Sequence, residues 1–289
     1  MKKYISEIGM ILMLMTKVIL GEGTTGAQFL SIGIGARACA MGQAYGAIAD
    51  DPSGIYWNPA GLSAVTSSQV MFCQNFWLLD MTHQYLAGVL PYHGGAFGLS
   101  AYYSSSGDIP KIEDFIKIGE YSAYDAAVSL AFARSLNSQI GYGLSAKYIA
   151  QKIDTENGST FAFDIGLIYD FRRDNSLKIA LAIQNIGPGV KFIDEKDKLP
   201  LNIKLSSAYL KENYALGIGL DREIDSDVIF GLGGEYVIKK TLALRAGYNT
   251  AHSYSLGFGI CWQKFDLSYC FAPNKDLDAS HRLSLVYGR

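Results

Sequence analysis

From residue 68 to the C-terminus, apolar residues alternate with small or polar ones in one short segment after another. In the clearest segment, residues 254–262, the even positions hold Tyr, Leu, Phe, Ile and Trp, and the odd positions hold Ser, Gly and Cys. Successive side chains of a β-strand point to opposite faces, so this period of two predicts a strand with one apolar face. The chain is therefore expected to be all-β.

About fourteen segments follow this pattern, an even number, as single-chain barrels of the bacterial outer membrane require. Residues 70–78 and 84–90 are the weakest of them. The segments are residues 70–78, 84–90, 97–103, 124–132, 140–148, 161–171, 177–183, 201–209, 214–220, 228–238, 242–248, 254–262, 265–271 and 281–287.

The less apolar face of these segments distinguishes a barrel from a soluble sheet. A soluble β-protein needs about a quarter to a third charged residues on its exposed faces, whereas this face is mostly Gly, Ala and Ser. Its sparse and nearly balanced charges fit a confined lumen. The charged residues expected to point into the lumen are Asp125, Lys147, Asp164, Asp170, Lys178, Lys204, Asp221, Glu235, Arg245, Asp266 and Arg282.

The opposite face carries Leu, Ile, Phe, Val and Tyr, with aromatic residues near the strand ends, where interfacial girdles lie. Hydrophobic residues make up 49% of the chain, yet after residue 30 no apolar run reaches the roughly 18 residues that a membrane helix needs. These features predict a transmembrane antiparallel barrel of about 14 strands, embedded in the lipid of the cell outer membrane. A soluble periplasmic β-protein is the alternative.

The connections between the segments are of two kinds. Short ones alternate with a set that includes long polar loops, as in outer-membrane barrels with tight periplasmic turns and longer outside loops. The long loops are expected at residues 104–122, 151–159, 187–199 and 273–280.

The N-terminus divides into two parts before the barrel begins. Lysines at positions 2 and 3 precede an apolar run at residues 8–16, which predicts a secretory signal over residues 1–21, with a short amphipathic helix as the alternative. Residues 22–66 do not alternate, and we expect them to form a hatch inside the lumen. Residues 67–289 are expected to form the barrel.

The hatch segment carries a combination of short motifs: Gly-Ala-Arg-Ala, Met-Gly-x-Ala-Tyr, Ala-Asp-Asp-x-Ser and Tyr-Trp-Asn-Pro-Ala-Gly-Leu. In this combination the segment resembles the opening of the PorV/PorQ family, a branch of the FadL-like outer-membrane barrels. Gln43 and Pro52 stand where that family more often has Gly and Ala. The residues that carry the resemblance are Gly35, Arg37, Met41, Gly42, Asp50, Asp51, Trp57, Asn58, Pro59 and Gly61.

This resemblance implies one of two functions. In the first, the barrel is an accessory of type IX-like protein secretion, and its partners are secretion-system components or exported proteins. In the alternative, it passes hydrophobic small molecules across the outer membrane, as FadL-like transporters do. The chain is shorter than the secretion-associated members, mainly because its loops are smaller. This difference counts against the partner-specific activity of those members.

Local chemistry suggests structural roles for the hatch residues. Asn58 precedes a proline and is pushed toward extended backbone, so residues 57–61 are expected to form a rigid corner in which Asn58 bonds its own backbone. Asp50 and Asp51 are adjacent, lack a nucleophile or acid partner in the pattern, and are expected to cap turns or to pair with Arg37 or with lumenal Lys and Arg residues. Glycines in this segment permit close packing in a narrow lumen.

Other classes of function find little support. The net charge of −2 offers no basic stripe for nucleic acid. The cysteines, Cys39, Cys73, Cys261 and Cys270, lack zinc-site spacing, and their disulfide connectivity stays open. The histidines at 83, 93, 252 and 281 are expected to be surface or interfacial. No enzymatic activity, cofactor or metal is expected.

Overall fold

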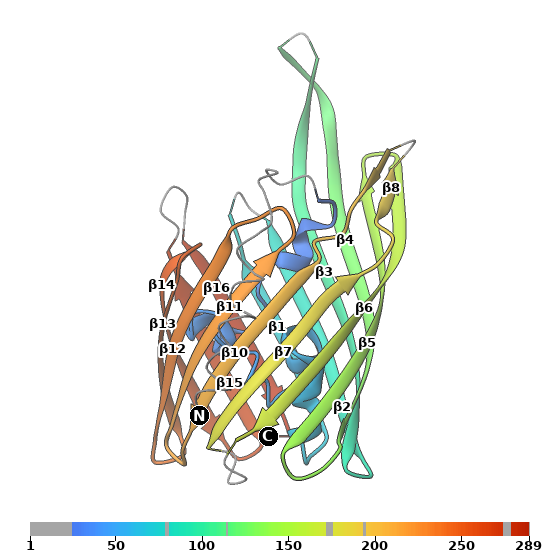
Figure 1. Cartoon of the computed structure of the whole chain (residues 1–289). Helices are drawn as coiled ribbons and strands as arrows, with labels where there is room; N and C mark the ends of the chain where they lie inside the picture. Colours follow the sequence, from blue (N-terminus) through green and yellow to red (C-terminus); the bar gives the residue numbers. More distant parts are fainter. Residues whose placement is uncertain are drawn as a thin grey trace.

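The structure, a computed structural model, describes residues 25–288 except 79–80, 114, 172–175, 193–194 and 274–278. The signal predicted for residues 1–21 lies outside the described residues. In the part that is described, fourteen antiparallel strands form a closed barrel and two more form a small separate sheet (Figure 1). The predicted all-β barrel of about 14 strands is confirmed.

The strands are of unequal length, from 3 to 20 residues. They are β1 (Gln69–Phe76), β2 (Thr82–Tyr92), β3 (Gly95–Glu113), β4 (Ile116–Ser135), β5 (Ile140–Ile153), β6 (Glu156–Asp170), β7 (Leu177–Ile186), β8 (Val190–Phe192), β9 (Glu195–Asp197), β10 (Asn202–Leu210), β11 (Tyr214–Glu223), β12 (Val228–Ile238), β13 (Leu242–Asn249), β14 (Ser253–Trp262), β15 (Phe265–Ala272) and β16 (Ser280–Tyr287).

Barrel closure joins the first strand to the last. β1 pairs with β16 in antiparallel register, with Val70 opposite Tyr287 and Phe76 opposite His281. Consecutive strands pair around the rest of the wall, except that β7 pairs with β10 because β8 and β9 lie in the connection between them. A closed ladder leaves no strand edge with unpaired backbone groups, which a lipid environment would penalise.

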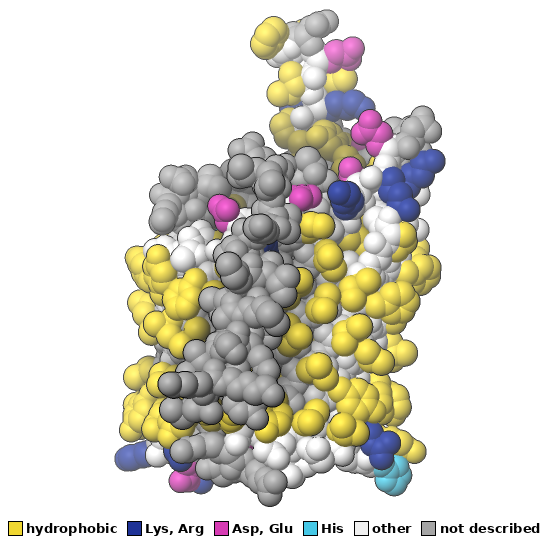
Figure 2. Space-filling view, viewed as in Figure 1, with side chains coloured by type: hydrophobic (Ala, Val, Ile, Leu, Met, Phe, Trp, Pro, Cys, Tyr) yellow, Lys and Arg dark blue, Asp and Glu magenta, His cyan; other side chains and the backbone are white. Residues whose placement is uncertain are grey.

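The two faces of the wall differ as the alternation predicts. Along β6 buried and exposed residues alternate almost without exception, with Phe163, Ile165 and Leu167 on the exposed side. On the face of the barrel seen in Figure 2, apolar side chains form a belt, and charged ones lie near its two rims. Because bilayer hydrocarbon solvates such a belt and water does not, the outer face is the lipid face.

Several segments that we expected to be loops are strands. β3 and β4 extend to residues 113 and 116 as a hairpin that rises beyond the rest of the barrel (Figure 1). β5 and β6 continue through the predicted loop at 151–159, and β8 and β9 lie within 187–199. Beyond the membrane both faces of a hairpin meet water, so the apolar alternation that marks lipid-exposed strands disappears there.

The hatch fills the lumen and supplies the core of the molecule (Figure 1). Its helices are η1 (Gln28–Ser31), α2 (Ala36–Ala40), α3 (Gly54–Trp57) and η2 (Pro59–Ala64). α2 packs against β13 to β16, and η2 packs against β3 to β6. The largest fully buried apolar side chains of the hatch are Met41, Tyr45, Ile48, Ile55, Trp57 and Leu62.

Helices of the described residues are short, and none is long and apolar enough to cross a membrane.

The two ends of the barrel are distinct. The β3–β4 hairpin and the β8–β9 sheet lie at one end, here called the long-loop end (Figure 1). Tight turns such as those at residues 93–94 and 211–213 join strands at the other, the short-turn end. In outer-membrane barrels the short turns face the periplasm, so the long-loop end is the outer one.

Candidate functional site in the barrel lumen

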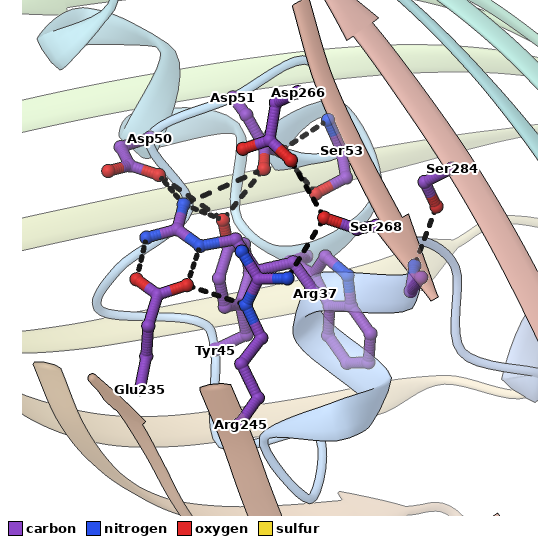
Figure 3. A network of polar contacts seen from close by, with 12 residues as sticks. Arg37, Tyr45, Asp50, Asp51, Ser53, Glu235, Arg245, Asp266, Ser268 and Ser284 are labelled. Atoms are coloured by element: carbon purple, nitrogen blue, oxygen red, sulfur yellow. Dashed lines mark hydrogen bonds and ion pairs between the residues drawn. The ribbon is translucent and has the colours of Figure 1, made fainter. Parts of the chain in front are cut away.

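A buried ionic cluster surrounds Arg37 of α2 (Figure 3). Its Nε and Nη2 atoms donate to the two carboxylate oxygens of Glu235 on β12 at 2.9 and 2.8 Å. Its Nη1 atom donates to Asp50 at 2.5 Å and to the Tyr45 hydroxyl at 2.8 Å. That hydroxyl in turn donates to Asp51 at 2.8 Å. The guanidinium thus ties three segments together, and the predicted pairing of Asp50 with Arg37 is confirmed.

The cluster continues into the wall. Glu235 also accepts from Nε of Arg245 on β13 at 2.6 Å. Arg245 donates through Nη1 to the hydroxyl of Ser268 on β15 at 2.9 Å, and Ser268 donates to Asp266 at 2.8 Å. Glu235 therefore shares one carboxylate between a hatch cation and a wall cation. The structure brings together three of the predicted lumenal charges and three charged residues of the hatch motif.

Each charge in this cluster has a partner, so the cluster fastens the hatch rather than performing chemistry. Burial by itself would lower the pKa of the Arg37 guanidinium, but the attraction of Asp50 and Glu235 outweighs burial and raises that pKa well above its ordinary value. Asp51 accepts from the backbone N–H of Ser53 at 2.9 Å, which is the turn-capping role expected for it. Breaking such a buried pair costs about 3–5 kcal/mol.

A second attachment lies at the Asn58–Pro59 corner. Asn58 is extended (φ −163°, ψ 108°), and its Oδ1 atom accepts from the Ala60 N–H at 3.0 Å. Its Nδ2 atom donates to the Gly46 carbonyl at 3.2 Å and to the carbonyl of Leu167 on β6 at 3.4 Å. The predicted bond of Asn58 to its own backbone is confirmed. The same side chain also joins two parts of the hatch to the wall.

Glycines of the wall let the hatch backbone approach. A Cβ atom added at Gly143 or Gly166 would lie 2.3 Å from a Pro59 backbone carbon or 2.1 Å from Oδ1 of Asn58. On the opposite side, a Cβ added at Gly233 would lie 2.0 Å from the Met41 carbonyl oxygen. The sequence predicted close packing from the hatch glycines, and the structure adds that the wall glycines are equally necessary.

Two further lumenal cations are paired within the wall. Nζ of Lys147 lies 3.0 Å from Asp164 and donates to Asn185 at 2.7 Å. The Asn185 backbone N–H donates to the same Asp164 at 2.8 Å, beside a register shift between β6 and β7. Lys204 forms an ion pair with Asp221 and lies 5.2 Å above the Trp57 ring.

The remaining predicted lumenal charges lie apart from these pairs. Asp125 on β4 accepts from the Gln151 side chain at 2.7 Å. Lys178 and Asp170 lie opposite each other on β7 and β6 near the short-turn end, and both are buried. Both line a polar vestibule of about 550 Å³ beneath the hatch, together with Asp50.

A narrow apolar cavity lies between the hatch and strands β2 to β5. Three tyrosines line it, and their hydroxyls donate to hatch carbonyls: Tyr56 to Leu30 at 2.9 Å, Tyr102 to Ile32 at 3.4 Å and Tyr85 to Pro52 at 3.4 Å. The tyrosines therefore present their rings rather than their hydroxyls to the cavity. Its lining residues are Leu30, Ile34, Ile55, Tyr56, Tyr85, Ser100, Tyr102, Ala127, Ser129 and Lys147.

The volume of this cavity, about 10 Å³, is close to that of one water molecule. A larger solute passes only if side chains of the hatch or the wall move.

His83 corrects one expectation. We expected it at the surface or interface, but it is 2% exposed and points into the lumen, with its ring centroid 6.1 Å from those of Trp77 and Tyr102. Apolar residues occupy both faces of β2, with Tyr85 inside and Leu86 outside. Alternation therefore does not mark the inner face of this strand. For that reason the sequence did not predict that aromatic side chains of β2 and β3 point into the lumen.

The four cysteines form no disulfide bond with one another. Burial raises the pKa of the Cys39 thiol on α2 to about 12. Among the described residues, no group of three or more His, Cys, Asp or Glu side chains is arranged to hold a metal ion.

Comparison with solved structures identifies the architecture. The barrel superposes on the CymD monoaromatic hydrocarbon channel with a TM-score of 0.68 and 13% identity, covering 89% of this chain and 97% of that one. It superposes on the Pseudomonas putida toluene transporter TodX with a TM-score of 0.66 and 12% identity, covering 94% and 99%. This chain has the fold of the FadL-like outer-membrane barrels.

A Pseudomonas aeruginosa FadL homologue is also similar, with a TM-score of 0.58 and 11% identity over 93% of this chain and 98% of that one. The sequence matches no family model, and no curated protein matches it significantly. The expected outer-membrane location agrees with this fold and with the apolar belt. These neighbours are named as a channel and a transporter. The expectation of no enzymatic activity stays a prediction.

Proposed function

We propose that the protein is a passive channel for hydrophobic small molecules across the outer membrane. The observation that carries this proposal is the tyrosine-lined cavity between the hatch and strands β2 to β5. The structural neighbours CymD and TodX are named as channels for monoaromatic hydrocarbons and for toluene, which supports the same class of solute here.

The distribution of charge in the lumen fits this class. Arg37, Arg245, Lys147 and Lys204 are each paired with a carboxylate, so these cations do not present a free charge to a passing ion. A neutral apolar solute gains from ring contacts in the cavity and loses little hydration on entering it. The hatch stays fastened by the ionic cluster and the Asn58 corner while the solute moves past side chains.

Uptake of labelled toluene by a diderm host that lacks channels of this fold tests the proposal. Expression of the protein should raise the initial uptake rate, and Ala127→Trp should abolish most of the increase because the indole fills the cavity. Ala127 is 4% exposed and lines the cavity, whereas its neighbour Val128 is 50% exposed on the lipid face. Val128→Trp is therefore the matched control and should transport as the unmodified protein does.

Uptake that does not rise on expression would contradict the proposal, provided that heat-modifiable migration on gels shows a folded barrel. Equal loss in both tryptophan variants would show that the cavity is not the path.

The resemblance of the hatch motif to PorV/PorQ proteins supports a second candidate, an accessory of protein secretion. One feature of the surface favours a protein partner. The tip of the β3–β4 hairpin exposes Ile112, Phe115, Ile116 and Ile118 by 54 to 102% beyond the apolar belt. Exposed apolar clusters of this kind mark binding surfaces.

Substituting Phe115 and Ile116 by Ser separates the two candidates. A secretion accessory should lose export of its cargo in the native host and keep its toluene permeability. A solute channel should keep both its permeability and normal export.

A further inference from the structure

A shallow groove lies on the lipid face of the barrel, over strands β11, β12 and β13. Its volume is about 440 Å³, which falls within the roughly 300–1,000 Å³ typical of small-molecule sites. Glu235 and Arg245 border the groove, but their charged groups lie in the lumen, where they pair with each other. The other residues that form it face outward and are apolar, aromatic or small: Tyr214, Leu216, Gly234, Tyr236, Leu244 and Ala246.

Two small residues side by side interrupt the apolar belt here. In the register of the wall, Gly234 of β12 lies opposite Leu216 of β11 on one side and opposite Ala246 of β13 on the other. The hatch requires the neighbouring Gly233, where an added Cβ would lie 2.0 Å from the Met41 carbonyl oxygen. Gly234 points away from the hatch, and a Cβ there would first meet the flexible end of Leu216 at 3.3 Å. The approach of the hatch therefore does not account for the hollow at Gly234.

The groove lies in the periplasmic half of the bilayer. Its strands are joined to their neighbours by the turns at 211–213 and 239–241, which belong to the short-turn end. Gly234 is five residues from Lys239, so at about 3.3 Å per residue the groove reaches roughly 16 Å along the strand. Because the hydrocarbon of a bilayer is about 30 Å thick, this length corresponds to one leaflet.

Lysines lie at the periplasmic end of the groove. Lys211 holds its Nζ atom 5.7 Å from the centroid of the Tyr209 ring. That centroid lies 6.1 Å from the ring centroid of Tyr214, which borders the groove. The Lys211 ammonium is therefore on the outer surface, beside the groove, and Lys239 and Lys240 occupy the neighbouring turn.

The two turns carry an excess of positive charge. A hydrogen bond from the Val237 N–H to the Asn213 carbonyl, 2.7 Å long, holds them together. Glu212 is the one acidic residue of both turns and pairs with Lys240 at 3.3 Å. Three lysines less one glutamate leave a net charge of +2. The turns at 93–94 and 136–139, across the barrel, contain no Lys or Arg.

Lys239 and Lys240 occupy backbone positions that lysine disfavours. Their φ angles are 50° and 57°, and the turn is closed by the Thr241 N–H, which donates to the Ile238 carbonyl at 3.0 Å. Positive φ at both central residues is characteristic of type I′ turns, in which Asn-Gly is the preferred pair. Lysine at both positions strains the backbone, so the geometry of the turn does not account for the two cations.

We propose that this groove and the three lysines form a binding site for one anionic phospholipid of the periplasmic leaflet. An acyl chain lies in the hollow over Gly234 and Ala246, and the lysines hold the phosphate at the turns. Basic residues at a membrane surface attract anionic lipids, and an ammonium binds phosphate as a point charge. The tyrosines that border the groove suit the depth between chain and head group, because their rings are apolar and their hydroxyls polar. This inference does not depend on which solute the lumen passes.

Native mass spectrometry of the purified protein, titrated with dioleoyl phosphatidylglycerol or dioleoyl phosphatidylethanolamine, tests the proposal. The two lipids have the same chains and differ in net charge, so the ratio of their affinities reports on the lysines. At about fivefold for each net charge, phosphatidylglycerol should bind the unmodified protein about twenty-fold more tightly. Lys211→Gln should reduce this ratio about fivefold. Arg134→Gln removes an exposed cation at the same end of the barrel, on β4, and should leave the ratio unchanged.

A second variant separates lipid binding from the stability of the turn. Lys239→Asn combined with Lys240→Gly removes two charges and installs the preferred pair of a type I′ turn. The preference for phosphatidylglycerol should disappear, while the barrel should unfold at the same or a higher temperature. Loss of binding in this variant cannot then come from a damaged fold.

The groove is tested by filling it. Ala246→Phe should weaken the binding of both lipids by about fivefold or more, because the ring displaces the acyl chain from apolar contact. The ratio of the two affinities should stay unchanged. Ala101→Phe places the same ring on the lipid face of β3, away from the groove, and should change neither affinity.

Several results overturn the proposal. Equal affinity of the unmodified protein for the two lipids excludes recognition by charge, as does an equal effect of Lys211→Gln and Arg134→Gln. Unchanged binding in Ala246→Phe, or an equal loss in Ala101→Phe, excludes the groove. Displacement of phosphatidylglycerol by an equal concentration of glycerol 1-phosphate would reveal a site for free phosphate and would also overturn it.

Discussion

The hatch is fastened to the wall at two places that use different chemistry. Near β12 and β13, Arg37 is held by charge through Glu235, whose carboxylate also holds Arg245. Near β5 and β6, Asn58 and Pro59 are held by shape and neutral hydrogen bonds, against wall glycines that leave no room for a side chain. The first attachment depends on matched partners and the second on the absence of side chains.

This difference predicts how each attachment fails. A buried ion pair that loses one partner leaves an uncompensated charge, so its loss is expensive. A neutral corner that loses one hydrogen bond gives up about 1 kcal/mol and can relax. Charge should therefore dominate the free energy that holds the hatch, while the corner sets its position.

Removing both attachments should have the largest effect. Deletion of residues 27–62 should raise the single-channel conductance in planar bilayers by roughly an order of magnitude, because the side chains of fourteen strands do not fill a barrel this wide. The wall should still fold, since its ladder bonds do not involve the hatch. A wide, steady pore in the unmodified protein, unchanged by the deletion, would show that this segment does not block the lumen.

Removing the charged attachment alone should have the next largest effect. Glu235→Gln keeps the side-chain shape and leaves Arg37 and Arg245 without their shared carboxylate, which should weaken hatch docking by about 3–5 kcal/mol. Protease sensitivity of the hatch in detergent should rise accordingly. Glu212→Gln is the matched control, because Glu212 pairs with Lys240 in the open (75 and 78% exposed) and should change stability by less than about 1 kcal/mol.

Loosening the corner should have a smaller effect. Asn58→Ala combined with Pro59→Ala removes the cap of η2 and restores backbone freedom, so hatch docking should weaken by about 1–3 kcal/mol. Brief conductance bursts rather than a steady pore should appear in planar bilayers. Ser63→Ala, which removes a half-buried hydroxyl bonded within η2, should leave the conductance unchanged. A corner effect larger than that of Glu235→Gln would reverse the proposed ranking.

The smallest expected effect concerns the alkylation rate of Cys39, which reports on the attachment of α2 through Arg37. Because burial raises the pKa of Cys39 to about 12, its thiolate is scarce at pH about 8.5, and alkylation should be about a thousandfold slower than for a free thiol. A protein with Cys73, Cys261 and Cys270 replaced by Ser isolates this site. Ser138→Cys in the same background, but with Cys39 also replaced by Ser, puts the thiol on an exposed turn and should react rapidly.

Glu235→Gln should accelerate alkylation of Cys39. Asn58→Ala combined with Pro59→Ala should accelerate it by a smaller factor. Fast alkylation of Cys39 in the unmodified protein would mean that α2 detaches readily and that the ionic cluster does not hold it.

Much of the fold follows from alternation along the chain. The apolar side chains of β14, such as Leu256 and Phe258, face outward because lipid accepts them, and Gly, Ala and Ser face inward because the hatch leaves no space for more. The same alternation located the inward charges from Asp125 to Arg282. Alternation did not predict the β3–β4 hairpin, because both faces of that hairpin meet water. It did not predict the lumenal position of His83, because apolar residues occupy both faces of β2.

The sequence by itself determined the barrel, the direction of its faces and the segment that fills it, because these depend on periodicity and composition that neighbouring residues carry together. Tertiary structure alone decided which charges meet. Arg37 and Glu235 are 198 residues apart, and nothing near either one distinguishes that pair from other combinations. It also decided that Asn75 lies opposite Arg282 on one side and opposite His83 on the other, because a closed barrel brings the last strand next to the first.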